Sequence, residues 1–137
     1  MAFFLFWLLP FLTGDLQQNP CIKWNTAKNF DFYCIPDGKA PERMTWEEID
    51  KLKHVRLNQA SSVLTKSTCK PAEALIWMET YLLVVEFSAG QRKKLRVSNY
   101  GGFLSDLGGR FYYVQEADQQ KWLDILAEFR HQVNAQH

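Results

Sequence analysis

The fold is decided by the apolar stretch Tyr81-Leu82-Leu83-Val84-Val85-Glu86-Phe87. In a strand, successive side chains point to opposite faces, so Leu82 and Val84 point away from the other apolar residues. A strand that is apolar on both sides belongs inside a sheet whose two faces are both covered. We therefore expect a central strand here, in a sheet whose two faces are both covered.

The segments around this strand predict an antiparallel meander. A turn at 88–91 leads into the alternating segment Lys94-Leu95-Arg96-Val97, which has one polar face, and a further strand follows at 110–114. The glycine pairs Gly101-Gly102 and Gly108-Gly109 permit tight reversals between them. Two more strands are expected, one at 30–35 on the edge of the sheet and a short one at 62–65, for a total of about five.

Two helices are expected. The C-terminal helix can cover one face of the sheet, and the other face needs the earlier helix, a second curved sheet layer or a partner. Thr45-Trp46-Glu47-Glu48 is the pattern of a capping box, and it predicts a helix near residues 45–59. Alternation at 54–58 leaves a strand open as the alternative, and 72–77 suits a helical turn or a strand equally. A C-terminal amphipathic helix is expected over 117–134, with a buried stripe formed by Trp122, Ile125, Phe129 and Val133. The fold class is therefore α+β, with the meander packed against the C-terminal helix.

The chain divides into an apolar leader (1–14), a polar linker (15–29) and a single α+β domain (30–137). The apolar run at 2–12 is shorter than the roughly 20 residues that cross a bilayer, but it fits the apolar region of a secretory signal. Because no Lys or Arg precedes this run and its end is a poor cleavage site, an uncleaved membrane-associated segment and a buried part of the fold stay open. We expect an exported (periplasmic or secreted) or membrane-associated protein.

Composition and cysteine spacing exclude several classes. A formal net charge of +1 argues against a dedicated nucleic-acid binder. Cys21, Cys34 and Cys69 have neither a C-x-x-C spacing nor a nearby histidine, so no metal site is expected. In an oxidising compartment one pair of these cysteines can form a disulfide, with three possible pairings. The third cysteine is then a free thiol, and Cys69 is the one that looks most like it. The alternative is three reduced, buried cysteines.

The loop at 99–110 is the most distinctive part of the sequence for recognition. Its aromatic residues and arginine are of the types enriched in binding hot spots. The candidate partner-binding residues here and in the following strand are Tyr100, Phe103, Arg110 and Tyr112. The alternative is that the glycine pairs form ordinary hairpin turns and the aromatic residues fill a small core.

Lys94 and Arg96 lie on one face of their strand and form a candidate anion-binding pair. An ordinary solvated strand is the alternative. The C-terminus resembles pleckstrin-homology domains, in which a strand is followed by a helix containing a tryptophan, as Tyr112-Tyr113-Val114 precedes Trp122. The resemblance implies binding of anionic lipid or phosphate ligands by basic strand residues.

Known catalytic and nucleotide-binding motifs are absent from the sequence, and we expect no catalytic residue and no cofactor. The function expected is that of a non-catalytic binding module of the inhibitor, immunity or accessory type, which recognises a protein partner. A small enzyme without a recognisable motif is a further alternative, with Asp106 and Arg110 as its candidate site.

Overall fold

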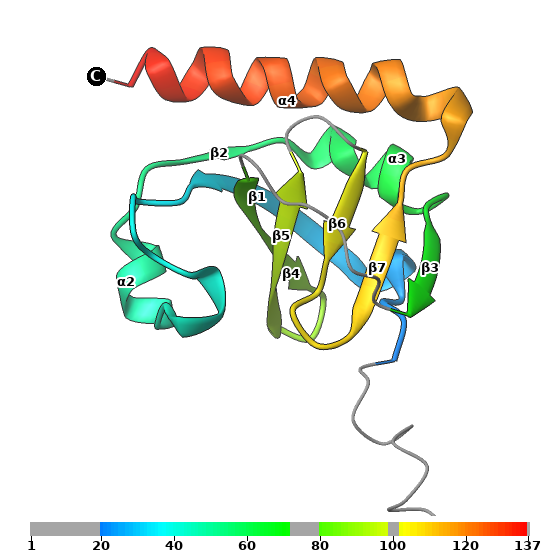
Figure 1. The fold of residues 1–137 in the computed structure, drawn as a ribbon, viewed down its shortest axis with the longest axis horizontal. Coiled ribbons are helices and arrows are strands. Elements are labelled where there is room, and N and C mark those ends of the chain that lie inside the picture. Colours follow the sequence, from blue (N-terminus) through cyan, green and yellow to red (C-terminus); the bar gives the residue numbers. More distant parts are fainter. Residues whose placement is uncertain (1–19, 72–79, 99–101, 137) are drawn as a thin grey trace, which may run out of the picture.

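The computed structural model describes residues 20–71, 80–98 and 102–136. The elements, with 3-10 helices labelled η, are η2 (Trp24–Thr26), β1 (Ala27–Cys34), η3 (Pro41–Arg43), α2 (Trp46–Asp50), β2 (His54–Arg56), η4 (Asn58–Ala60), α3 (Ser61–Leu64), β3 (Thr68–Pro71), β4 (Thr80–Phe87), β5 (Arg92–Ser98), β6 (Phe103–Ser105), β7 (Arg110–Tyr113), η5 (Glu116–Asp118) and α4 (Gln119–Asn134). The predicted α+β fold with a C-terminal helix is confirmed (Figure 1). The apolar leader and the ambiguous segment 72–77 lie outside the described residues.

Within the described residues, seven strands form one antiparallel sheet in the order β2-β1-β4-β5-β6-β7-β3. The antiparallel meander is confirmed as β4 to β7, but about five strands were predicted, and β6 lies in the segment 99–110 that was predicted as a loop. The strand predicted for the edge, β1, instead lies between β2 and β4, with Phe32 opposite Val55 on one side and Leu83 on the other. That prediction was wrong because 54–56, taken as helix, pairs with β1 and forms the edge itself.

The central strand β4 is buried on both faces, as its sequence predicts. Leu83 and Val85 belong to the larger core, which includes the buried residues of α4, and Leu82 and Val84 belong to a smaller core that includes Ile49 of α2. The two helices therefore cover opposite faces of one sheet. We call the side of the smaller core the second face.

Helix α4 lies across the ends of β5, β6 and β7 (Figure 1). Its Trp122 is fully buried and contacts the ring of Phe32, which also contacts Phe129. Full burial of such a side chain contributes about 1.5–3 kcal/mol. The predicted stripe is confirmed at Trp122, Ile125 and Phe129, and Val133 packs against the same core at partial burial.

Helix α2 begins at the predicted capping box but ends nine residues before the expected boundary at 59. Thr45 Oγ1 accepts the Glu48 N–H at 3.1 Å, and Glu48 Oε1 accepts the Thr45 N–H at 3.1 Å. The hydrogen bond from the Thr45 N–H to the carboxylate lowers the pKa of Glu48, and the Lys39 ammonium lowers it further. Beyond Asp50 the backbone pairs with β1 and buries Val55, and tertiary pairing overrides the helical continuation.

The strand predicted at 62–65 was also wrong, since this segment is α3. Val63 and Leu64 are neighbours and both are fully buried on the same core, whereas a strand would direct them to opposite faces. Ser62 and Thr65 also donate their hydroxyls to the carbonyls of Gln59 and Ser61. Such bonds fit a helical turn.

The second face of β5 is partly enclosed by α2 and η3, rather than simply solvated. Lys94 Nζ donates to the carbonyls of Pro41 (3.1 Å) and Met44 (2.8 Å). The Arg92 guanidinium lies 4.1 Å from the centroid of the Trp46 ring, and Lys94 Nζ lies 5.4 Å from it. A cation–π contact contributes about 0.5–2 kcal/mol, so these cations help to hold α2 on the sheet.

The sheet is curled, because the chain just before β1 meets the far edge formed by β7 and β3. Cys21 is disulfide-bonded to Cys69 of β3, and the Ile22 N–H donates to the Tyr112 hydroxyl at 2.9 Å. Trp24 is buried against Tyr112. The folded part of the chain therefore begins earlier than the 15–29 linker implies. The reading of Cys69 as the leftover thiol was wrong, since Cys34 is the free cysteine.

Candidate binding cleft

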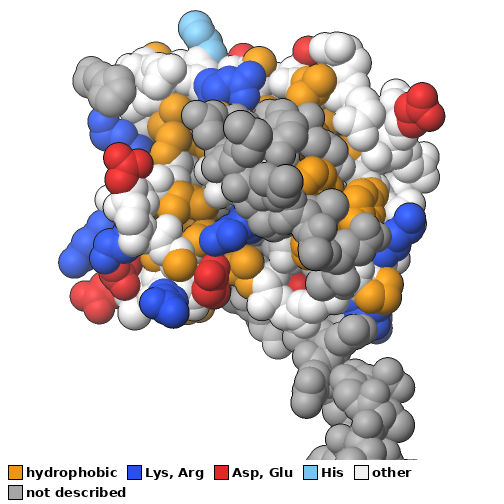
Figure 2. Space-filling model, in the orientation of Figure 1, with side chains coloured by type: hydrophobic (Ala, Val, Ile, Leu, Met, Phe, Trp, Pro, Cys, Tyr) orange, Lys and Arg blue, Asp and Glu red, His pale blue; other side chains and the backbone are white. Residues whose placement is uncertain are grey.

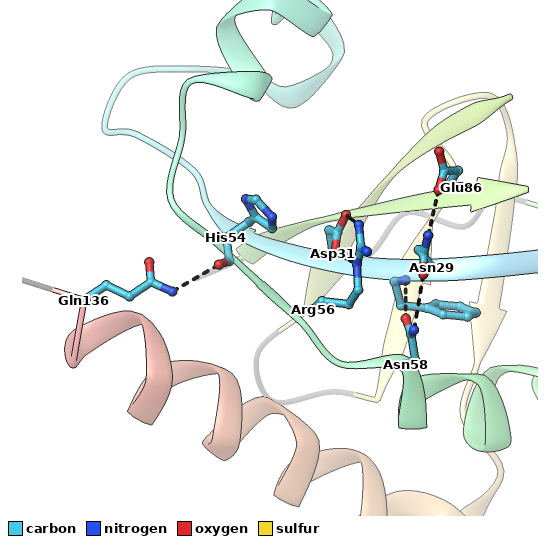
Figure 3. A network of polar contacts seen from close by, with 8 residues as sticks. Asn29, Asp31, His54, Arg56, Asn58, Glu86 and Gln136 are labelled. Carbon is cyan, nitrogen blue, oxygen red and sulfur yellow. Dashed lines mark hydrogen bonds and ion pairs between the residues drawn. The ribbon is translucent and has the colours of Figure 1, made fainter. Parts of the chain in front are cut away.

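A charged cleft lies on the second face, between α2 and the strands β1, β2, β4 and β5. It has a volume of about 220 Å³ and is lined by Asp31, Tyr33, Asp50, His54, Arg56, Val84, Glu86 and Arg92. Strand alternation gathers these side chains, because each strand contributes the residues that point away from the larger core. Figure 3 shows several of them, from β1, β2 and β4, lying side by side.

Two ion pairs form the walls of this cleft. Arg56 donates to both carboxylate oxygens of Asp31, from Nε at 2.8 Å and from Nη2 at 3.1 Å, and the two residues are direct cross-strand partners. Arg92 Nη1 donates to Asp50 Oδ1 at 2.7 Å and connects β5 to α2. The hydrogen bonds that the two arginines donate to these carboxylates raise the pKa of both guanidinium groups, which therefore stay charged.

The phenol of Tyr33 belongs to the same group. Burial raises its pKa, the carboxylates of Asp31 and Asp50 raise it further, and the nearby guanidinium groups oppose this effect. Its ring centroid lies 5.2 Å from that of His54. Tyr33 is therefore a neutral hydroxyl at physiological pH, able to donate one hydrogen bond and to accept others.

Glu86 differs from the other two carboxylates of the cleft. Its Oε1 accepts from the Asn29 amide at 2.7 Å, and Asn29 in turn accepts from Asn58 at 3.2 Å, as Figure 3 shows. Arg92 is the cross-strand partner of Glu86, but its hydrogen bond goes to Asp50. Three carboxylates thus face two guanidinium groups, and the formal charge of the cleft is −1 with a neutral histidine.

The predicted partner-binding residues do not form one exposed patch in the described part of the chain. Tyr100 lies outside the described residues. Phe103 is buried and stacks on Phe111, with centroids 6.3 Å apart. Tyr112 is fully buried, and both burial and its hydrogen bond to Ile22 tie it to the core. Arg110 is half-buried at the start of β7. Phe103 and Tyr112 therefore take part in packing, the alternative left open above.

The predicted anion-binding pair is engaged by other groups. Lys94 donates to two backbone carbonyls, and Arg96 Nη2 lies 3.4 Å from Glu42 Oε2. The structure therefore uses these cations to hold the segment around α2. Figure 2 shows basic and acidic side chains interspersed over the face that it presents. The order of strand and helix on which the pleckstrin-homology resemblance depends is present as β7 and α4. Lys94 and Arg96, however, contact the segment around α2.

Asp106, which we named for the enzyme alternative, organises a turn. Its Oδ1 accepts from the N–H groups of Gly108 (2.8 Å) and Arg110 (3.0 Å), and its Oδ2 lies 3.6 Å from Lys93 Nζ. Leu107, between Asp106 and Gly108, has a backbone φ of +64°. An aspartate that accepts backbone N–H groups two and four residues ahead stabilises such a tight reversal.

Cys34 is an exposed residue at the end of β1, and it lines a pocket together with Leu52 and with Val133 of α4. Partial burial of its thiol raises the pKa. A thiol with a raised pKa is a poor nucleophile at neutral pH.

Across 20–71, 80–98 and 102–136, His, Cys, Asp and Glu side chains do not gather in groups of three that would suit a metal ion.

The residues of the cleft were missed by sequence reasoning. The one available signal was the alternation at 54–58, which places His54 and Arg56 on the same face if the segment is a strand. Arg56 pairs with Asp31, which is 25 residues away in sequence, and Arg92 pairs with Asp50, which is 42 residues away. No local sequence pattern predicts either pair.

None of the described helices has the length and apolar character that a membrane crossing requires. Models of known protein families, curated protein sequences and solved structures were all compared with this chain, and no match was found in any of the three.

Proposed function

We propose that this protein is a non-catalytic binding module that recognises a protein partner, and that the cleft receives a basic side chain of that partner. The observation that supports this proposal is Glu86, a partly buried carboxylate whose hydrogen bond comes from an amide while both guanidinium groups of the cleft bond to other carboxylates. An incoming Lys or Arg supplies the missing positive charge. A charge-assisted bond of this kind is stronger than the neutral one that Glu86 makes.

The arrangement of the cleft favours binding over proton transfer. Asp31 and Asp50 are each fixed by an arginine, so the walls are held before a ligand arrives. Such preorganisation lowers the entropy lost on association. A volume of about 220 Å³ lies below the usual range for small-molecule sites and suits a single inserted side chain.

The neighbouring sheet edge supports recognition through side chains. β2 is an edge strand of the sheet, and an exposed edge can pair with a strand from another protein. Here Gln136 Nε2 donates to the His54 carbonyl at 3.1 Å, as Figure 3 shows. The carbonyl is thus already occupied, which disfavours strand addition at this position.

We further propose that the protein acts outside the reducing cytosol, as an exported or membrane-associated protein. The Cys21–Cys69 disulfide supports this, since such bonds persist mainly in oxidising compartments. The apolar run at 2–12 is consistent with it.

The test uses a capped peptide, Gly-Gly-Arg-Gly-Gly, as a probe of the cleft. Addition of this peptide to the isotope-labelled protein is expected to shift the amide NMR signals of cleft residues such as Asp31, His54 and Glu86. Glu86→Gln removes the charge and keeps the shape, and it should weaken binding by about fivefold, the upper range for a partly exposed ion pair. Glu47→Gln, an exposed position on α2 outside the cleft, is the matched control.

Two results reject the proposal. Equal affinity of Glu86→Gln and the parent shows that this carboxylate does not recognise the cation. Equal binding of a peptide with Glu in place of Arg shows that the cleft does not select positive charge.

A further inference from the structure

A second pocket lies where the chain enters the folded domain, beside the Cys21–Cys69 disulfide. Its volume is about 370 Å³, and the residues that matter for its chemistry are Pro20, Ile22, Lys23, Phe87, Ala89 and Lys93. One wall is the segment that precedes β1, and the other is the turn between β4 and β5. This pocket is separate from the charged cleft and shares no lining residue with it.

Hydrogen bonds fix the two walls relative to each other. The Lys23 carbonyl accepts from both the N–H (3.0 Å) and the hydroxyl (2.8 Å) of Thr26. The Thr26 carbonyl in turn accepts the Ser88 N–H at 2.9 Å, which ties the entry segment to the hairpin turn. The pocket is therefore a built feature of the fold.

The charge at this pocket is positive. Lys23 is exposed at the rim, and no carboxylate of a described residue lies within ion-pair distance of it. Lys93 lies 3.6 Å from Asp106, whose side chain is fully buried, whereas a quarter of the Lys93 side chain is exposed. An ammonium group has three N–H donors, so Lys93 can still donate into the pocket. The described lining includes no acidic side chain.

The remaining surface of the pocket is mainly apolar. Ile22 and Phe87 are partly buried and pack against the larger core, and part of each faces the pocket. Pro20 and Ala89 add further apolar surface. A cation at the rim with an apolar floor complements a ligand that has one anionic group and an apolar chain.

We infer that this pocket binds the anionic end of an amphiphile, a carboxylate or phosphate joined to an apolar chain. The anion contacts Lys23 and Lys93, and the first carbons of the chain contact Ile22 and Phe87. This chemistry is shared by free fatty acids and by acidic lipids in a bilayer. It goes beyond the proposed function, because the charged cleft selects a cation and this pocket selects an anion.

The test measures binding of dodecanoate by NMR and calorimetry below its micelle concentration. Shifts are expected in segments 20–26 and 87–93. Lys23→Gln should weaken binding by about tenfold, because it removes a charge-assisted bond at a position whose side chain is exposed and not needed for folding. Ala89→Asp, in the exposed turn, should weaken it at least as much. The matched control is Lys28→Gln, an exposed lysine of β1 outside the pocket, which should bind like the parent.

Three further probes separate the possible sources and outcomes. Dodecanol tests the chain alone, inorganic phosphate tests the anion alone, and phosphatidylglycerol vesicles test a bilayer source. Lys23-dependent binding of dodecanoate supports a free amphiphile, and Lys23-dependent binding of the vesicles alone supports a membrane lipid.

The inference is overturned if neither dodecanoate nor the vesicles bind. It is also overturned if dodecanol binds as well as dodecanoate, if phosphate alone binds as well, or if Lys23→Gln and Lys28→Gln bind equally.

Discussion

The disulfide offers a large perturbation of stability whose size can be worked out from this fold. Cys21 is exposed and joins Cys69 across a sequence separation of 48 residues. Removing this cross-link by Cys21→Ser releases a loop of that length in the unfolded chain. The chain-entropy relation for a closed loop then gives a loss of about 4 kcal/mol.

That loss is a large share of the roughly 5–15 kcal/mol by which domains are stable. The assay is urea unfolding followed by tryptophan fluorescence, comparing the parent with Cys21→Ser. With a urea dependence of about 2 kcal/mol per molar, the midpoint should fall by about 2 M. Because β7 is the one partner of β3 among the described strands, the amides of β3 should also exchange faster with solvent in the variant.

Cys34→Ser is the matched control, since it removes a sulfur and leaves the cross-link intact. Its midpoint should stay close to that of the parent. The reasoning is refuted if Cys21→Ser unfolds at the same urea concentration as Cys34→Ser.

Two smaller perturbations follow from local contacts. Burial raises the pKa of Tyr112 to about 12 from an ordinary 10. The contribution of Tyr112 to the free energy of unfolding should therefore be constant below pH 10 and fall between pH 10 and 12, where the unfolded chain loses a proton that the folded chain retains. Urea unfolding at pH 9, 10 and 11 measures this fall, and an equal slope in Tyr112→Phe would contradict the assignment. Thr45→Ala removes the cap of α2 and should lower the free energy of unfolding by about 1 kcal/mol, and an unchanged unfolding midpoint would show that the capping box adds nothing.

The start of helix α2, which borders the candidate cleft, could be anticipated from sequence, whereas the residues that line the cleft could not. The α2 cap depends on residues three apart, so Thr45 and Glu48 identify it locally. His54 and Arg56 depend on whether their segment is extended, which short-range propensity left undecided. Asp31 and Arg92 carry no local sign of their partners, because each is fixed by a residue that is distant in sequence.

The same reason explains the errors in the predicted sheet. The segment at 54–58 suits a helix or a strand locally, and the free β1 edge decided in favour of the strand. Val63 and Leu64 are residue types that suit a strand, but both side chains are buried in the same core, which a helical turn allows and a strand does not. Tyrosine is a residue type enriched in binding hot spots, which suggested a role in recognition for Tyr112. The curl of the sheet instead buries it beneath the segment that precedes β1.

The sequence by itself determined the elements whose information is local or strongly periodic: the central strand with two apolar faces, the capped start of α2, and the amphipathic α4 with its buried Trp122. Only the tertiary structure decided the strand order, the Cys21–Cys69 pairing and the two candidate sites. The physical reason is that hydrophobic periodicity specifies which face of an element is buried, but not which other element covers it. The charged cleft is made of side chains that point away from the larger core, whereas the second pocket forms where the segment before β1 meets the turn between β4 and β5.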